Sequence, residues 1–177
     1  MTRQEYRETL EYELFKFFTG NRKSFLQRLR VMYFQPNTNC VYLARKMWYL
    51  HQKGKLSRLR AKLLYLKIIR KYGCVIFPNA EVGRGFSITH PTGIVIGNCK
   101  IGTDFMIYQN CSIGSKTPGD DTPEIGDHVE LSTNSVVLGH IRIADNVLIG
   151  ANSLVIKDIP EPGVYAGNPV RKIRDNF

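Results

Sequence analysis

The first 72 residues of this chain contain few acidic side chains. They hold four acids (Glu5, Glu8, Glu11 and Glu13) and 17 of the 25 Lys and Arg residues, a net charge of +13. Residues 73–177 hold 8 basic and 11 acidic residues, a net charge of −3. This asymmetry predicts a basic first part and a mildly acidic second part. A basic field favours anionic lipid head groups, nucleic acid or phosphorylated substrates, and the alternative is a solvated helical face.

Other absences narrow the class of protein. No window of 18 or more apolar residues exists, so we expect no membrane-spanning helix. The first residues, MTRQEYRETLEYE, are charged from the start, so we expect no signal peptide. The cysteines form no CxxC motif and no metal-ligand spacing, which predicts free, buried thiols, a cytoplasmic protein and no metal requirement. They are Cys40, Cys74, Cys99 and Cys111.

Aliphatic residues recur every six positions in the second part. Small residues follow several of them, such as Gly102, Gly126 and Gly150. Period six is neither helical nor a two-residue alternation. It fits short strands joined by tight corners, stacked so that the aliphatic side chains form a continuous buried column. The sequence therefore predicts a parallel β-helix of four to five coils. The series comprises Ile76, Val82, Ile88 and Ile94, then after one extra residue Ile101, Ile107, Ile113, Ile125, Leu131, Val137, Ile143, Ile149 and Val155.

No aliphatic residue occupies position 119, where this period expects one. The gap from Ile113 to Ile125 is two repeats wide and contains SKTPGDDTPE, with two prolines and three acids. This composition predicts an excursion loop over residues 115–124. Because loops on rigid scaffolds often carry functional residues, Asp120, Asp121 and Thr122 are candidate substrate-loop residues. The alternative is an insertion without a function.

Apolar residues at helical spacing predict helices through residues 1–72. One stripe contains Tyr6, Leu10, Leu14, Phe17 and Phe18, and a second contains Phe25, Leu29, Met32 and Tyr33 and ends near Pro36. A third segment covers 41–51 and is closed by Gly54. The fourth, KLSRLRAKLLYLKIIRKYG, is a basic amphipathic helix that could lie on an anionic membrane. We expect its stripe to pack on the β-helix or a neighbouring subunit, with the basic face near a membrane. That stripe contains Leu56, Leu59, Leu63, Leu66 and Ile68 or Ile69.

Several segments in order resemble the hexapeptide-repeat acyltransferases. They are FSITHPTGIVIG, MIYQNCSIG, the acidic loop, IGDHVELSTNSVVLGHIRIADNVLIGANSLVIKDIP and AGNPVRKI, and together they cover residues 75–174. The resemblance is to the serine acetyltransferase branch and implies a left-handed parallel β-helix. It implies a domain over 73–177, with a C-terminal tail at 160–177, after a basic α-helical region over 1–72.

The resemblance also implies a mechanism. His90 matches the catalytic histidine of the family, and an imidazole suits a general base that deprotonates a hydroxyl acceptor. Acetyl-CoA is the implied co-substrate, without a metal. Gln109, one coil on from His90, resembles a glutamine near the site. Galactoside-type acetyltransferases carry their base in a loop histidine, and SKTPGDDTPE has none. His128 and His140 lie at outward or corner positions and are expected to be structural.

Acetyl-CoA positions follow from the same resemblance. Thr133 and Ala151 match corner residues that line the pantetheine groove between adjacent subunits, which implies a homotrimer or a dimer of trimers. Gly167, Asn168 and Pro169 match the turn that closes the coil stack. Cations suit the adenosine phosphates, although each taken singly could be a plain surface charge. The matching cations are Lys157, Arg171 and Arg174.

Departures from the serine acetyltransferase pattern point to another acceptor. Thr89 stands where that branch has an aspartate before its histidine, and Val75 replaces an aspartate that orients the histidine. Asp121 and Thr122 replace an Arg-His pair that holds the amino acid. The basic helical N-terminal part resembles bacterial polysaccharide O-acetyltransferases of the colanic-acid type.

We therefore expect an acetyl-CoA-dependent O-acetyltransferase acting on a sugar hydroxyl of a surface polysaccharide or its precursor. The expected location is the cytoplasm, with possible peripheral contact at the inner membrane face. A divergent serine O-acetyltransferase of cysteine biosynthesis is one alternative, and a non-catalytic β-helix scaffold is another. No recognised motif supports nucleic-acid binding.

Overall fold

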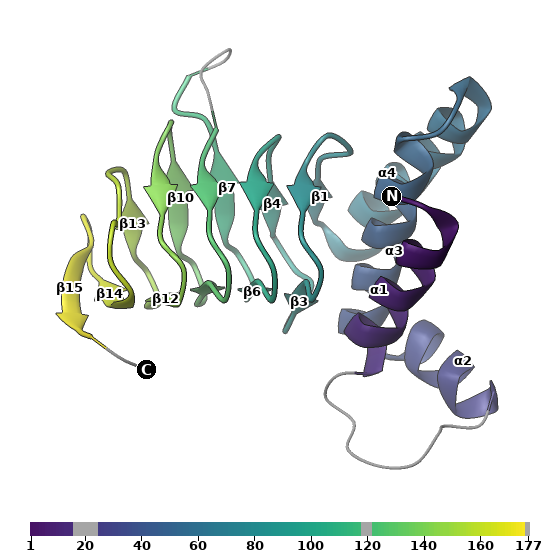
Figure 1. Cartoon of the computed structure of the whole chain (residues 1–177), viewed down its shortest axis with the longest axis horizontal. Helices are drawn as coiled ribbons and strands as arrows, with labels where there is room; N and C mark the ends of the chain where they lie inside the picture. Colours follow the sequence, from purple (N-terminus) through teal and green to yellow (C-terminus); the bar gives the residue numbers. More distant parts are fainter. Residues whose placement is uncertain (16–24, 118–121, 176–177) are drawn as a thin grey trace.

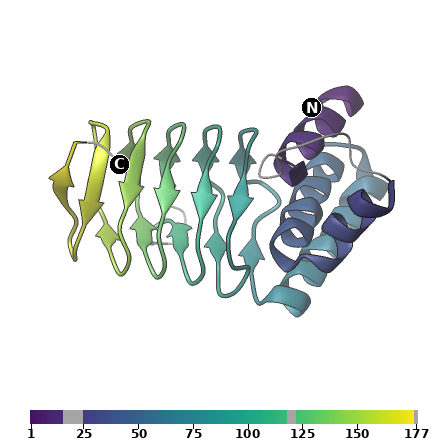
Figure 2. The same cartoon turned by 90° about the horizontal axis from the view of Figure 1, so that it is seen from below.

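The computed structural model describes residues 1–15, 25–117 and 122–175. Four helices form one end of the molecule, and a β-helix extends from them to the C-terminal strand at the other end (Figures 1 and 2). The helices are α1 (Arg3–Phe15), α2 (Phe25–Phe34), α3 (Pro36–His51) and α4 (Lys55–Tyr72).

The described part of the β-helix has three sheets of short strands, and each of the first four coils contributes one strand to every sheet in turn. In the fifth coil, a single bridge from Ile159 to Ile143 takes the place of a sheet B strand. All strand pairs are parallel except the last, β14 with β15. Sheet A contains β1 (Val75–Ile76), β4 (Val95–Ile96), β7 (Ser112–Gly114), β10 (Val136–Leu138) and β13 (Leu154–Val155). Sheet B contains β2 (Glu81–Val82), β5 (Lys100–Ile101), β8 (Glu124–Ile125) and β11 (Arg142–Ile143). Sheet C contains β3 (Ser87–Ile88), β6 (Met106–Ile107), β9 (Glu130–Leu131), β12 (Val147–Ile149), β14 (Gly163–Ala166) and β15 (Arg171–Arg174). The predicted β-helix is confirmed.

The strand register corrects one position of the predicted series. Ile96, rather than Ile94, pairs with Ile76 in the first coil and with Ile113 in the third. Ile94 is also fully buried, but it precedes the strand as the last residue of a corner. The corner before β4 spans 89–94 and has six residues, whereas the corners 108–111, 132–135 and 150–153 below it have four. The extra residues therefore lie beside His90.

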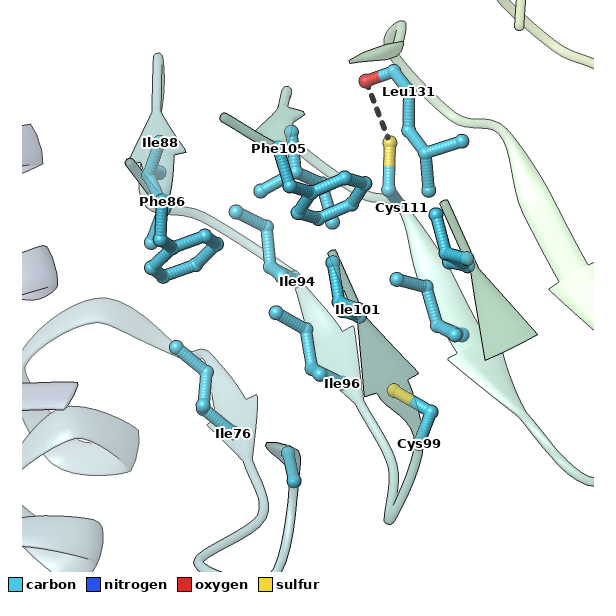
Figure 3. Packing of buried hydrophobic residues seen from close by; sticks show 14 of the residues in the cluster. Ile76, Phe86, Ile88, Ile94, Ile96, Cys99, Ile101, Phe105, Cys111 and Leu131 are labelled. Atoms are coloured by element: carbon cyan, nitrogen blue, oxygen red, sulfur yellow. Dashed lines mark hydrogen bonds between the residues drawn. The ribbon is translucent and has the colours of Figure 1, made fainter. Parts of the chain in front are cut away.

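The inward side chains form a single apolar column. The rings of Phe86 and Phe105 stack with centroids 6.2 Å apart, and Ile96 and Ile101 pack beneath them (Figure 3). Residues two positions before an inward strand residue also point inward, so that Cys99, before Ile101, and Cys111, before Ile113, are buried as well. All four cysteines are free and buried, as predicted. Because interiors pack at near-crystalline density, these stacked rows hold every corner in a fixed position.

The helices share this core instead of forming a separate one. Trp48 of α3 lies edge-on to Phe86 of the first coil, with ring centroids 5.6 Å apart, and its Nε1 donates to the Phe77 carbonyl at 3.0 Å. The helix α3 begins at Pro36, five residues earlier than predicted, because proline at the first helical position is preorganised for a helix. Phe17 and Phe18 lie outside the described residues.

A buried ion pair connects the helices to the first coil. The Arg45 guanidinium donates to both carboxylate oxygens of Glu13, at 2.6 and 3.1 Å, and to the carbonyls of Val82 and Gly83, at 2.7 and 2.8 Å. Glu13 Oε1 in turn accepts the N–H groups of Gly85 and Phe86, both at 3.0 Å. Burial raises the pKa of Glu13, and the Arg45 charge with these hydrogen bonds works in the opposite direction. The pair therefore fixes the segment that leads into β3.

The leucine stripe of α4 does not pack on the β-helix. The buried side of α4 contains Ala61 and Ile68, whereas Leu56, Leu59 and Leu63 are 66%, 57% and 60% exposed. The expected packing on the β-helix is therefore wrong for these three leucines, and packing on a neighbouring subunit stays a prediction. No helix among the described residues is both long and apolar enough to cross a membrane.

Candidate active site

Five of the predicted site residues lie in register along one edge of the β-helix, where sheet C turns into sheet A. Ile88 pairs with Ile107, Ile107 with Leu131, Leu131 with Ile149, and Ile149 with Tyr165. Two residues after each of these strand positions, the register places one predicted site residue per coil. In order they are His90, Gln109, Thr133, Ala151 and Gly167. We call this the His90 edge.

His90 lies in the enlarged corner at the start of this edge and is exposed. Its carbonyl accepts the Thr92 N–H at 2.9 Å, and the Thr92 carbonyl accepts the Asn110 N–H at 2.9 Å. Gly93 follows with φ +64°, and a Cβ there would collide with the Asn110 side chain. The corner therefore returns to sheet A only through glycine and displays the imidazole at the surface.

Gln109 lies one coil below His90, as predicted. Its Oε1 atom is buried and has no hydrogen-bond partner among the described residues. An unsatisfied buried acceptor costs about 1–3 kcal/mol, so native structures seldom leave one without a reason. The amide oxygen is therefore available to a donor that reaches this edge.

Below Gln109 the edge carries small side chains. Thr133 is half-buried and Ala151 is exposed. Asn134 and Asn152 hold the left-handed corner positions beside them, and the Asn134 amide donates to Asn152 Oδ1 at 3.0 Å. With coils about 4.8 Å apart, the four steps from His90 to Gly167 span about 19 Å. A narrow molecule could lie along this track in an extended form.

The C-terminal tail closes the edge. Gly167 has φ +110°, and its N–H donates to Ser153 Oγ at 3.1 Å. Asn168 and Pro169 complete the turn into β15, whose Arg171 pairs with Ala166 beside the edge. Arg174 pairs with Val164 farther from the edge. Both arginines are exposed.

Two predicted groups do not lie on the His90 edge. Lys157 is in the corner after β13, where sheet A turns into sheet B, so sheet A separates it from the His90 edge. The excursion loop leaves the same second edge between β7 and β8. Thr122 Oγ1 donates to the Asn98 carbonyl there. Asp120 and Asp121 lie outside the described residues.

The other β-helix histidines are exposed on different edges, as expected. His128 has φ +55° in the corner between sheets B and C, and His140 lies in the corner that follows β10. Among the described residues, no group of three or more His, Cys, Asp or Glu side chains is arranged to hold a metal ion.

Sequence reasoning missed a carboxyl group beside the His90 edge. Glu130, on the outer face of sheet C, is hydrogen-bonded to Tyr108, the neighbour of Gln109, and burial raises the pKa of this carboxyl. From the sequence it looks like any polar residue preceding an inward Leu131. Only the register, which pairs Met106 with Glu130, brings it near Tyr108.

Comparisons with known proteins agree with this architecture. Residues 122–157 match the family described as bacterial transferase hexapeptide (six repeats). The serine acetyltransferase of Staphylococcus epidermidis is 41% identical over 123 residues, which cover 67% of this chain and 58% of that protein. Serine acetyltransferase 2 of Arabidopsis thaliana is 36% identical over 135 residues, 75% of this chain and 40% of that protein. The chain thus spans about 40% to 58% of the length of these two relatives.

Solved structures extend the likeness to the helices. Neisseria gonorrhoeae serine acetyltransferase superposes with a TM-score of 0.83 and 26% identity, over 98% of this chain and 67% of that chain. The soybean serine acetyltransferase apoenzyme gives 0.81 and 26%, over 96% of this chain and 69% of that chain.

These matches place the β-helix of this chain in the hexapeptide-repeat transferase family. The relatives reported above within it are serine acetyltransferases. The expected closeness to acetyltransferases of the colanic-acid type is not supported. Because the superposition with the Neisseria gonorrhoeae protein covers nearly the whole chain, a helical N-terminal part does not set this chain apart from serine acetyltransferases.

Proposed function

We propose that this protein is an acetyl-CoA-dependent O-acetyltransferase with His90 as general base. The observation that carries the proposal is the His90 edge, on which an exposed imidazole heads a track of small side chains about 19 Å long. An extended pantetheine arm has a comparable length. Arg171, level with Ala166 at the far end of the track, suits the phosphates of CoA.

The proposed chemistry is acyl transfer. His90 accepts the proton of the acceptor hydroxyl while its oxygen attacks the thioester carbonyl, which gives a tetrahedral intermediate. When the carbon–sulfur bond breaks, the imidazolium returns the proton to the leaving thiolate. The buried Gln109 Oε1 atom accepts a hydrogen bond from a donor on the bound substrates and so gains the partner that it lacks among the described residues.

L-serine is the first candidate acceptor, because the relatives and solved structures described above are serine acetyltransferases. A sugar hydroxyl is the second. It is favoured by Thr89, Val75 and Thr122, which replace residues that the serine acetyltransferase resemblance assigns to histidine orientation and amino-acid binding.

We also propose a homotrimer in the cytoplasm. The described ends of the excursion loop, at β7 and β8, lie on a different edge of the β-helix from His90, and sheet A separates the two edges. A loop that contributes to the acceptor site must therefore come from a second copy of the chain. Light scattering coupled to size-exclusion chromatography would measure this mass, and a monomer with full activity would contradict the shared site.

Release of free CoA thiol tests the function, with L-serine and a panel of sugars as acceptors. His90→Ala should lower kcat by about 10²–10⁴-fold. The matched control is His128→Asn, because asparagine already holds the equivalent left-handed corner at Asn146, and it should leave the rate unchanged. Turnover that survives His90→Ala would refute the base assignment. Failure of the wild-type chain to bind CoA in a thermal-shift assay would refute the proposed function and favour a scaffold role.

A further inference from the structure

Helix α4 has two opposite apolar faces, and the described residues of the chain cover one of them. Ala61 and Ile68 are fully buried on the inner face, which packs on α3 and β1. The outer face contains Leu56, Leu59 and Leu63, spaced by three and four residues so that they lie on one side of the helix. Each of these leucines is more than half exposed. Large apolar side chains clustered on a surface mark an interaction site.

Cations border this leucine face on both sides. At 100° per residue the leucines form a central strip, with cations on its two flanks and Arg70 within it. One flank contains Lys55, Arg58 and Lys62, and the other contains Arg60, Lys67 and Lys71; all seven cations are exposed residues. Lys71 Nζ donates to Asn39 Oδ1 of α3 at 3.0 Å, so the other six cations carry the argument. The helix has no acid among its 18 residues. Such long side chains can keep their charges in the head-group layer while their stems cover apolar surface.

We propose that the outer face of α4 docks this protein on an anionic phospholipid surface, with the helix lying in the plane of the interface. The leucines enter the boundary of the acyl chains and the flanking cations bind lipid phosphates. A contact between the α4 helices of two copies fits this face poorly, because it would bring two sets of seven cations together. Nucleic acid fits it poorly as well, because a phosphate backbone leaves the central leucines exposed to water.

Sedimentation with vesicles tests the docking of the full-length chain. The wild-type protein should bind vesicles that contain phosphatidylglycerol and phosphatidylcholine, and it should stay in solution with phosphatidylcholine alone. Binding should weaken as salt is added, because salt screens charges near a surface. Leu56→Ser/Leu59→Ser/Leu63→Ser should weaken the partition onto anionic vesicles by at least about tenfold.

The matched control is Ile173→Ser. Ile173 is an aliphatic residue of similar exposure, 63%, and stands among cations in β15. Strand β15 lies at the opposite end of the molecule from α4 (Figure 1). Ile173→Ser should bind vesicles like the wild type. Circular dichroism and thermal melting of both variants check that they fold.

Results of two kinds would overturn the proposal. One is equal vesicle binding by the triple variant and the wild type, or no binding by either. The other is a smaller oligomer for the triple variant in light scattering without lipid, which would assign the face to subunit contact.

Discussion

Replacing Arg45 by methionine should destabilise the junction between the helices and the first coil more than any surface change. The substitution leaves the Glu13 carboxyl, whose side chain is 0% exposed, without its cationic partner, and it removes the donors to the Val82 and Gly83 carbonyls. Removal of one partner from a buried ion pair costs about 3–5 kcal/mol. For a domain of this size, each kcal/mol shifts Tm by roughly 2–4 °C, so we expect Tm to fall by about 6–20 °C.

Urea unfolding followed by circular dichroism would measure this loss, with thermal melting as a second readout. Lys172→Met is the matched control. Its ion pair with Glu161 has a similar N–O distance, 2.8 Å, but the side chains of Lys172 and Glu161 are 30% and 68% exposed. Exposed pairs contribute about 0–1 kcal/mol. A loss below about 1 kcal/mol for Arg45→Met, or one equal to the control, would refute the assigned role of the pair.

Three further predictions concern the site and the thiols. Gly93→Ala should lower the free energy of unfolding in denaturant by roughly 1–3 kcal/mol and should lower kcat. The reason is that φ is +64° and the added Cβ meets Asn110 beside the His90 corner. An unchanged unfolding midpoint would contradict this prediction. Ala151→Leu should raise KM for acetyl-CoA about tenfold with little change in kcat, and an unchanged KM would place CoA elsewhere. Hydrogen bonding from Cys40 lowers the pKa of Cys74 to about 7, but both residues are fully buried. The native protein should therefore resist a thiol reagent that labels all four cysteines in urea. Rapid labelling of the native protein would contradict the burial.

The β-helix could be predicted because its periodicity is a property of the inward side chains alone. The six-residue spacing from Ile125 to Val155 corresponds to one short strand in each repeat and one corner between successive repeats. The position of the enlarged corner was harder to predict. Ile94 and Ile96 are both aliphatic and both buried, so the sequence could not show which of them pairs with Ile76.

The placement of His90, Gln109 and Thr133 in successive coils could also be predicted, since it follows from counting repeats. The Arg45–Glu13 pair could not, because it joins residues 32 apart through the fold of two helices. The exposure of Leu56, Leu59 and Leu63 on α4 could not be predicted for a related reason. The helix has apolar residues on two sides, and the sequence alone does not show that Ile68 and Ala61 make the inner contact.

The acceptor depends on what orients His90. A general-base histidine needs a partner on its second ring nitrogen to hold the correct tautomer. In the serine acetyltransferase pattern aspartates stand near the histidine, whereas here Thr89 and Val75 occupy those positions. In the described part of this chain no residue hydrogen-bonds to the His90 ring. We expect the orienting group to come from the bound acceptor or from a neighbouring copy of the chain in the proposed trimer. If a neighbouring copy supplies it, groups at the contact between copies distinguish serine from a sugar as the acceptor, and a structure of the proposed trimer with bound acceptor would reveal them.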